Sequence, residues 1–135
     1  METRIITGTC TRTPETMKKY FDIAEKRKAN PERYRPFSPY EREVIQEFTH
    51  WFIIDNDFPY DAIATVNHMI FTKRKVPFTW ELLTDEEREE LELLKRTYIS
   101  DRYDVLYENL PSGQTKPGHF HLHLLVLKRF ELTAG

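Results

Sequence analysis

The sequence predicts an α+β domain in which helices pack against an antiparallel β-sheet. Signals for helix starts occur near residues 13, 38 and 84, and runs rich in β-branched and aromatic residues follow the second and third of them. Helices and strands do not alternate one by one, which is typical of α+β folds and not of parallel α/β sheets. A chain of 135 residues is long enough to bury one core, so we expect one compact domain.

Charge and cysteine content narrow the class of protein. Lys and Arg number 20 against 22 Asp and Glu, a formal net charge of −2, so bulk charge gives no sign of a nucleic-acid or anionic membrane partner. The single cysteine, Cys10, excludes a disulfide within the chain, and no apolar run is long enough for a transmembrane helix. We therefore expect a soluble cytoplasmic protein.

Two helices are predicted in the N-terminal part of the chain. Thr13 is placed to cap the first helix, Pro14 stands in its first turn, and Asn30, which precedes a proline, ends it. Ser38 is followed by a proline and then by a glutamate at the capping-box position, so a second helix is predicted from there to about Phe48. This part is expected to be a helical extension.

The C-terminal part is predicted to hold the sheet. A hairpin-like connection joins the first two predicted strands, which are therefore expected to be antiparallel neighbours. Thr84 and Glu87 form a capping-box pattern that starts a helix over about residues 85–100. The predicted strands are residues 51–56, 64–72, 104–108 and 119–127. The chain is accordingly divided into an N-terminal helical extension, residues 1–50, and a core, residues 51–135.

The last predicted strand carries the clearest candidate site. Three of the five histidines, His119, His121 and His123, alternate there with apolar residues. Successive side chains of a strand point to opposite faces. The three imidazoles are therefore expected to line one face of the sheet, while the apolar residues between them enter the core.

The residues alone leave two kinds of chemistry open. Three imidazoles are a sufficient set of ligands for a catalytic zinc ion, which would activate a water molecule. A neutral imidazole is also a good nucleophile towards phosphorus near pH 7, because its ordinary pKa of about 6.5 leaves it mostly unprotonated. His50, which stands alone before a strand, is expected to be structural.

Residues 119–125, His-Phe-His-Leu-His-Leu-Leu, resemble the signature of the histidine triad (HIT) superfamily of nucleotide hydrolases and transferases. Three shorter stretches resemble other parts of that family in the same order along the chain. They are an Asn-Asp-Phe-Pro turn at residues 56–59, a histidine-bearing strand at residues 68–71 and a Ser-Gly-Gln-Thr turn at residues 112–115. The resemblance extends over residues 51–129.

This resemblance implies a HIT-like α+β fold with a sheet of about five strands and a homodimeric assembly. It also implies a nucleotide hydrolase or nucleotidyltransferase that acts at the α-phosphate of a dinucleoside polyphosphate or a nucleoside phosphoramidate. The reaction would pass through a covalent nucleotidyl-histidine intermediate. No metal and no cofactor is implied.

The resemblance further implies roles for individual residues. His121 would attack the α-phosphate, with its other ring nitrogen held by an acceptor such as a backbone carbonyl. His123 would contact the phosphate or orient His121, and His119 would assist the leaving group. The substrate-binding residues would be Gln114 and Thr115 as donors to phosphate oxygens, Asn56 as an acceptor for ribose hydroxyls, and His68 behind the triad.

Two alternative functions stand beside this one. The first is a zinc-dependent hydrolase with the three histidines of the last strand as ligands. The second is a noncatalytic nucleotide-binding module that has kept the fold. The basic residues near the end of the first helix are expected to face solvent or to reach a distal phosphate of the nucleotide; they are Arg27, Lys28, Arg33 and Arg35.

Overall fold

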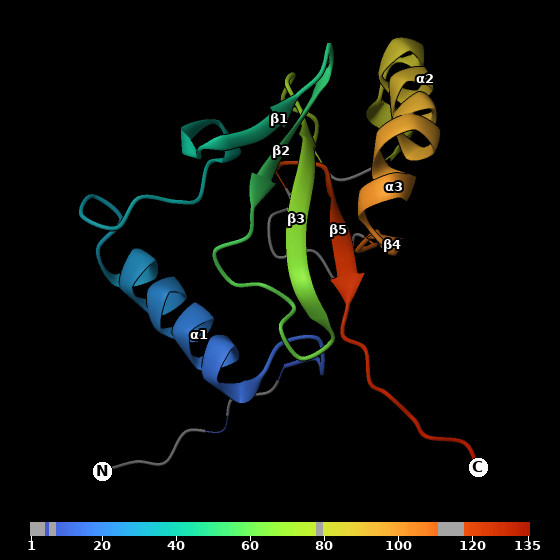
Figure 1. Cartoon of the computed structure of the whole chain (residues 1–135). Helices are drawn as coiled ribbons and strands as arrows, with labels where there is room; N and C mark the ends of the chain where they lie inside the picture. Colours follow the sequence, from blue (N-terminus) through green and yellow to red (C-terminus); the bar gives the residue numbers. More distant parts are fainter. Residues whose placement is uncertain (1–4, 6–7, 78–79, 111–117) are drawn as a thin grey trace.

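A five-stranded antiparallel sheet forms the centre of the computed structural model, which describes residues 5, 8–77, 80–110 and 118–135 (Figure 1). The strand order is β1-β2-β3-β5-β4, and every neighbouring pair is antiparallel. The predicted α+β class is confirmed. The strands are β1 (Val44–Glu47), β2 (Trp51–Asp55), β3 (Ala64–Thr72), β4 (Val105–Tyr107) and β5 (His121–Leu127).

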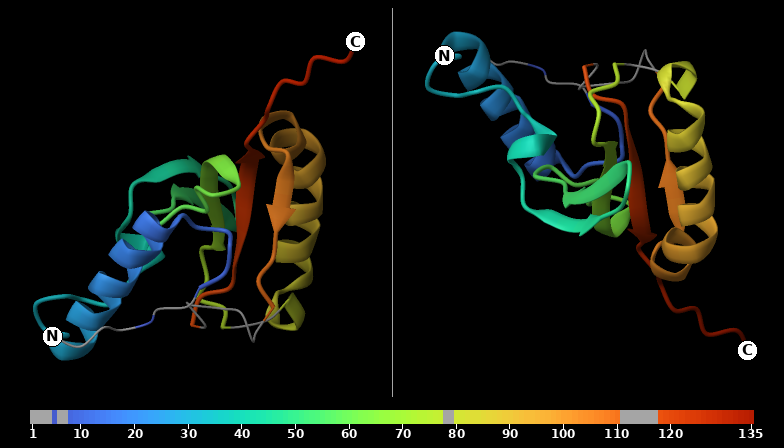
Figure 2. Two further views of the ribbon diagram at one scale, coloured as in Figure 1. Left: turned by 90° about the horizontal axis from the view of Figure 1, so that it is seen from below. Right: turned by 90° about the horizontal axis from the view of Figure 1, so that it is seen from above.

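Helices lie on both sides of this sheet (Figure 2). Helix α1 (Pro14–Ala29) lies on one side, and α2 (Asp85–Leu94) lies on the other. Helix α2 continues through a π-helical turn, Lys95–Ile99, into the short helix α3 (Ser100–Arg102). Within the described part of the chain, no helix combines the length and the apolar character needed to cross a membrane.

The main hydrophobic core lies between the sheet and α2. Phe120, Leu122 and Leu124 are almost fully buried in it, as the alternation of the last strand predicts. They pack with residues of β2 and β3 and with apolar residues of α2 and the turn after it. The other main members are Trp51, Ile53, Ile70, Leu91, Leu94 and Ile99.

The opposite face of the sheet carries a smaller apolar cluster and two of the histidines. The cluster consists of Phe52, Ile54, Met69 and Phe71, with Phe37 packed against it. In the register of β3 and β5, His121 stands opposite Phe71 and His123 stands opposite Met69. Directly opposed residues of an antiparallel pair share a face, so these two imidazoles are on the side of the sheet away from α2.

The helix predicted from Ser38 to Phe48 is wrong. The serine begins only a single 3-10 turn, Pro39–Glu41, and its side chain makes no capping hydrogen bond. The next residues form β1, whose backbone pairs with β2, and this long-range pairing overrides the local helix signal. Part of the segment expected to be a helical extension therefore belongs to the sheet, and the division at residue 50 stays a prediction.

Contacts with the turn after β2 hold the start of α1. Thr13 caps the helix as predicted, since its side chain accepts a hydrogen bond from the backbone N–H of Thr16. Asp61 in turn accepts from the backbone N–H of Thr13 at 2.9 Å and from its hydroxyl at 3.0 Å. The guanidinium of Arg12 lies 4.9 Å from the ring of Tyr20 and 4.8 Å from that of Tyr60. These contacts place α1 beside the histidine face of the sheet.

The start of α2 has the predicted capping box. The hydroxyl of Thr84 accepts from the backbone N–H of Glu87 at 3.1 Å, and the Glu87 carboxylate accepts from the backbone N–H of Thr84 at 2.8 Å. That carboxylate is buried and also accepts from Arg74 at 2.7 Å. The capping box thus anchors the helix that covers the main core.

Removing the hydroxyl of the capping residue should weaken the fold. The Thr84→Ala variant is expected to lower the free energy of unfolding by about 1 kcal/mol, measured by urea denaturation, because a backbone N–H at the helix start loses its acceptor. Thr97→Ala is the matched control, since that hydroxyl donates only to a carbonyl already inside the helix. Equal losses in the two variants would contradict the capping role.

Candidate functional site

The hydrogen bond of His121 defines which of its ring nitrogens can react. Its Nδ1 lies 2.9 Å from the backbone carbonyl oxygen of His119. A carbonyl oxygen only accepts, so the ring proton of neutral His121 is on Nδ1 and the lone pair is on Nε2. The ring also stacks on Phe71, with 4.8 Å between centroids and 19° between planes. A backbone carbonyl therefore holds the imidazole in the way that a nucleophile requires.

His123 lies beside it, deeper in the protein, with 3% of its surface exposed. The two imidazole centroids are 5.1 Å apart. The Nδ1 of His123 is 3.1 Å from the amide nitrogen of Asn67, and its Nε2 is 3.3 Å from the hydroxyl of Tyr60, on whose ring it stacks. His123 is thus fixed on two sides by polar groups.

His119 precedes the strand and is half-buried at one end of a cavity. Its ring meets the edge of Tyr40 at 5.9 Å, and its Nδ1 has no hydrogen-bond partner among the described residues. Burial lowers the pKa of His119, and the nearby positive charge of Lys75 lowers it further. Both effects favour the neutral form of this imidazole.

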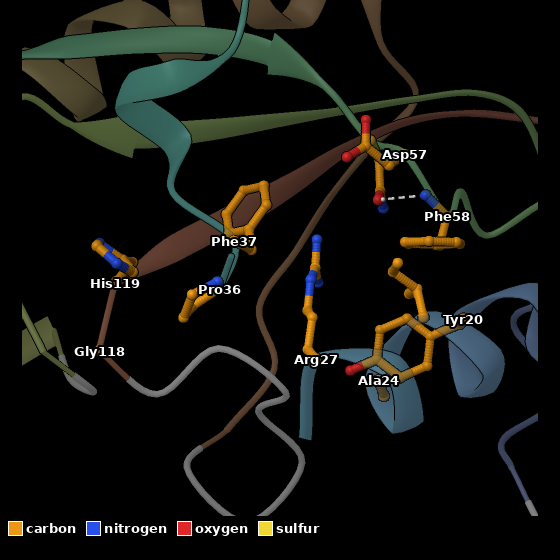
Figure 3. Close-up of a pocket in the computed structure, with 11 residues that line it drawn as sticks. Tyr20, Ala24, Arg27, Pro36, Phe37, Asp57, Phe58, Gly118 and His119 are labelled. Atoms are coloured by element: carbon orange, nitrogen blue, oxygen red, sulfur yellow. Dashed lines mark hydrogen bonds between the residues drawn. The ribbon is translucent and has the colours of Figure 1, made fainter. Parts of the chain in front are cut away.

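The cavity has a volume of about 330 Å³ and lies between α1 and the loops at the histidine face (Figure 3). In Figure 3, Arg27 extends from α1 into this space, with Phe37 and His119 on one side and Tyr20 and Phe58 on the other. The rings of Tyr20 and Phe58 meet edge to face at 5.4 Å. The walls are thus largely apolar and aromatic, with a few polar groups, as is usual for sites that bind small molecules.

The charges at the cavity favour an anionic ligand. The Asp57 carboxylate borders it but pairs with Arg42, at 3.1 Å from Nε and 2.8 Å from Nη2. Arg27 forms no ion pair with any residue that the structure describes. Its charge, together with that of Lys75 near His119, is left to attract a negative group.

Asn56 also borders the cavity, although its side chain is almost fully buried. Its amide nitrogen donates to Oδ1 of Asn67 at 3.0 Å, and its Oδ1 accepts from the backbone N–H of Phe58 at 3.0 Å. A carbonyl oxygen can accept a second hydrogen bond, so binding of a ribose hydroxyl by Asn56 stays a prediction. The predicted phosphate donors Gln114 and Thr115 lie outside the described residues.

His68 lies on the other face of the sheet from His121 and His123, and its role in substrate binding stays a prediction. It stands opposite Leu124 in the strand register and therefore points to the α2 side of the sheet. There its Nδ1 lies 2.6 Å from the hydroxyl of Tyr103. Asn67, one residue earlier on β3, takes the position on the histidine face and contacts His123. The apolar residues of β3 occupy both faces of the sheet, so only the register of β3 against β5 identifies Asn67 as the residue on the histidine face.

The arrangement of the three histidines tests whether they could bind a zinc ion together. Among the described residues, no group of three His, Cys, Asp or Glu side chains is arranged to hold a metal ion. The Nδ1 atoms of His121 and His123 face a carbonyl oxygen and an amide group of the protein, respectively. The three imidazoles, all among the described residues, are therefore not arranged as ligands of one metal ion.

These features define an α+β protein with two neighbouring imidazoles on one strand and a largely apolar cavity that a third histidine, His119, borders. No protein-family model matches the chain, and no curated protein matches it in sequence. Among solved structures, it is similar to a HIT family hydrolase from Legionella pneumophila Philadelphia 1. The two chains share 23% identity with a TM-score of 0.46, over 68% of this chain and 87% of that one. A likeness of this size does not establish a family.

Lowering the pH from about 7.5 to about 5.5 should reduce the melting temperature. Burial lowers the pKa of His68, with a partial offset from Asp55, and the pKa of His119 is lowered as well. The unfolded chain then binds protons more readily than the folded chain as the pH falls below the ordinary histidine pKa of about 6.5. Thermal denaturation followed by circular dichroism measures the effect.

The His68→Gln variant is the comparison for this measurement. It keeps a polar group beside Tyr103 but does not titrate, so its melting temperature should fall less over the same pH range. An identical fall in wild type and variant would remove His68 from the explanation.

Proposed function

We propose that this protein is a nucleotide hydrolase or nucleotidyltransferase that acts at the α-phosphate of its substrate through a covalent intermediate on His121. The single observation that carries the proposal is the hydrogen bond from His121 Nδ1 to the carbonyl oxygen of His119, which leaves the lone pair on Nε2. The resemblance of residues 119–125 to the histidine triad signature supports the same assignment.

The reaction has two displacements at phosphorus. In the first, His121 Nε2 forms a bond to the α-phosphorus while the bond from phosphorus to the leaving group breaks, and the leaving group departs with the electron pair. In the second, water attacks the phosphorus and loses a proton, and the bond to Nε2 breaks and restores the lone pair. A second acceptor in place of water would give nucleotidyl transfer.

The protonation state of His119 favours a particular leaving group. Burial and the charge of Lys75 lower the pKa of His119, so the protonated form that could give a proton to a departing amine is less populated. A nucleoside phosphate or polyphosphate departs as a stable anion and needs no such proton. We therefore place dinucleoside polyphosphates ahead of nucleoside phosphoramidates as the substrate class.

The cavity supplies a place for the nucleoside. Tyr20, Phe37 and Phe58 give it aromatic walls, against which a planar base can pack. Arg27 supplies a positive charge within the same space. We propose that the guanidinium binds a phosphate group beyond the α-phosphate.

Replacing His121 with alanine should abolish turnover of a diadenosine polyphosphate and the trapping of labelled nucleotide on the protein, because no other group supplies the nucleophilic nitrogen. His50→Ala is the control histidine, and it should leave the rate unchanged. Turnover by the His121→Ala variant at the wild-type rate would reject the mechanism. Nucleotide binding by wild type without any turnover would indicate the noncatalytic module instead.

Replacing Arg27 with alanine should raise KM for a dinucleoside polyphosphate by about tenfold, the effect of losing roughly one charge-assisted hydrogen bond of about 1.5 kcal/mol. KM for a nucleoside phosphoramidate, which has no distal phosphate, should change much less. The neighbouring Lys28 is exposed and outside the cavity, so Lys28→Ala is the matched control. Equal changes in KM for the two substrates would refute a distal phosphate site.

A further inference from the structure

We propose that Asn67 is a positioning residue that fixes the ring proton of His123 on Nε2. The Nε2 proton of His123 then faces the hydroxyl of Tyr60, 3.3 Å away, and this contact holds the imidazole beside His121. The consequence for turnover rests on the proposed function, whereas the position of the His123 proton rests on the hydrogen bonds of Asn67 alone. Asn67 had no role in the resemblance between this chain and the histidine triad superfamily.

The first step is the orientation of the Asn67 amide. This side chain is 3% exposed, and its Oδ1 lies 2.9 Å from the backbone nitrogen of Tyr60. A backbone N–H can only donate, so the atom that faces it must be the amide oxygen. The same oxygen accepts from the Asn56 side chain at 3.0 Å. The oxygen and nitrogen of the amide are therefore distinguished by their partners.

The second step is the proton of His123. With Oδ1 placed, the Asn67 nitrogen donates one hydrogen to the carbonyl oxygen of His68 at 3.0 Å. Its other hydrogen faces Nδ1 of His123 at 3.1 Å. An imidazole nitrogen that faces an N–H donor must accept, so Nδ1 carries the lone pair and Nε2 carries the proton.

The third step compares the two neighbouring imidazoles. His121 has its proton on Nδ1, held by a carbonyl oxygen, whereas His123 has its proton on Nε2, since an amide N–H holds its Nδ1. Two rings with centroids 5.1 Å apart thus have opposite tautomers. His121 offers a lone pair to phosphorus, whereas His123, whose Nε2–H faces the hydroxyl of Tyr60 at 3.3 Å, is held beside it as a neutral ring.

A carboxylate at residue 67 tests this inference with little change of shape. The Asn67→Asp variant keeps an acceptor for Tyr60 and replaces the donor that faces His123 with an acceptor. The proton of His123 should then move to Nδ1, which nitrogen-15 NMR of the histidine rings in the full chain detects directly. His123 then loses the Nε2–H that faces Tyr60 and is held less firmly beside His121, so kcat should fall by about 100-fold with a much smaller change in KM.

The control variant is Thr65→Val, a polar to apolar change of nearly the same shape at an exposed position near the start of the same strand. Its hydroxyl donates only to the carbonyl of Val126, and it should leave both the His123 spectrum and kcat unchanged. A purely structural role for Asn67 would lower stability in Asn67→Asp without moving the proton between ring nitrogens.

The wild-type spectrum alone can overturn the inference. A His123 that is protonated on Nδ1 at neutral pH would contradict it, whether or not the Asn67→Asp variant folds. A proton on Nε2 that moves in the variant without a fall in kcat would reject the catalytic consequence. Absence of turnover on any nucleotide by the wild type, with the expected spectra, would reject the proposed function and leave the role of Asn67 in place.

Discussion

The buried amide of Asn67 connects the histidine strand to the turn that borders the cavity. A buried polar group that loses a partner costs free energy, and every hydrogen-bonding position of this amide is used. The turn after β2, the backbone of β3 and the ring of His123 must therefore keep their relative positions. A slip of β3 by one residue would turn Asn67 towards the α2 side, so the same contacts also specify the register.

The features that the sequence predicts correctly depend on interactions between residues close in the chain. The caps at Thr13 and Thr84 satisfy backbone groups of their own helices, and both occur as expected. The helix expected after Ser38 fails for the opposite reason. Its residues Val44–Glu47 pair with β2 as a strand, and no local signal reports that pairing.

The candidate site shows the same distinction between features set by local interactions and features set by long-range pairing. The alternation of β5 alone places His121 and His123 on one face, with Phe120 and Leu122 in the core. The choice between Asn67 and His68 depends on the register of β3 against β5, which the alternation within one strand does not contain. Likewise, the cavity wall formed by α1 depends on hydrogen bonds between Thr13 and Asp61. Asp61 is distant from that helix in the sequence, and only folding brings the two together.

The attachment of α1 bears on how binding preference can diverge among related chains. This helix contributes Tyr20, Ile23 and Arg27 to the cavity, yet none of its residues is fully buried, and polar contacts at its start tie it to Asp61. Substitutions on its inner side therefore disturb little packing. Evolution could reshape ligand choice on this helix while the chemistry of β5 stays untouched, so recognition and reactivity are separable traits in this architecture.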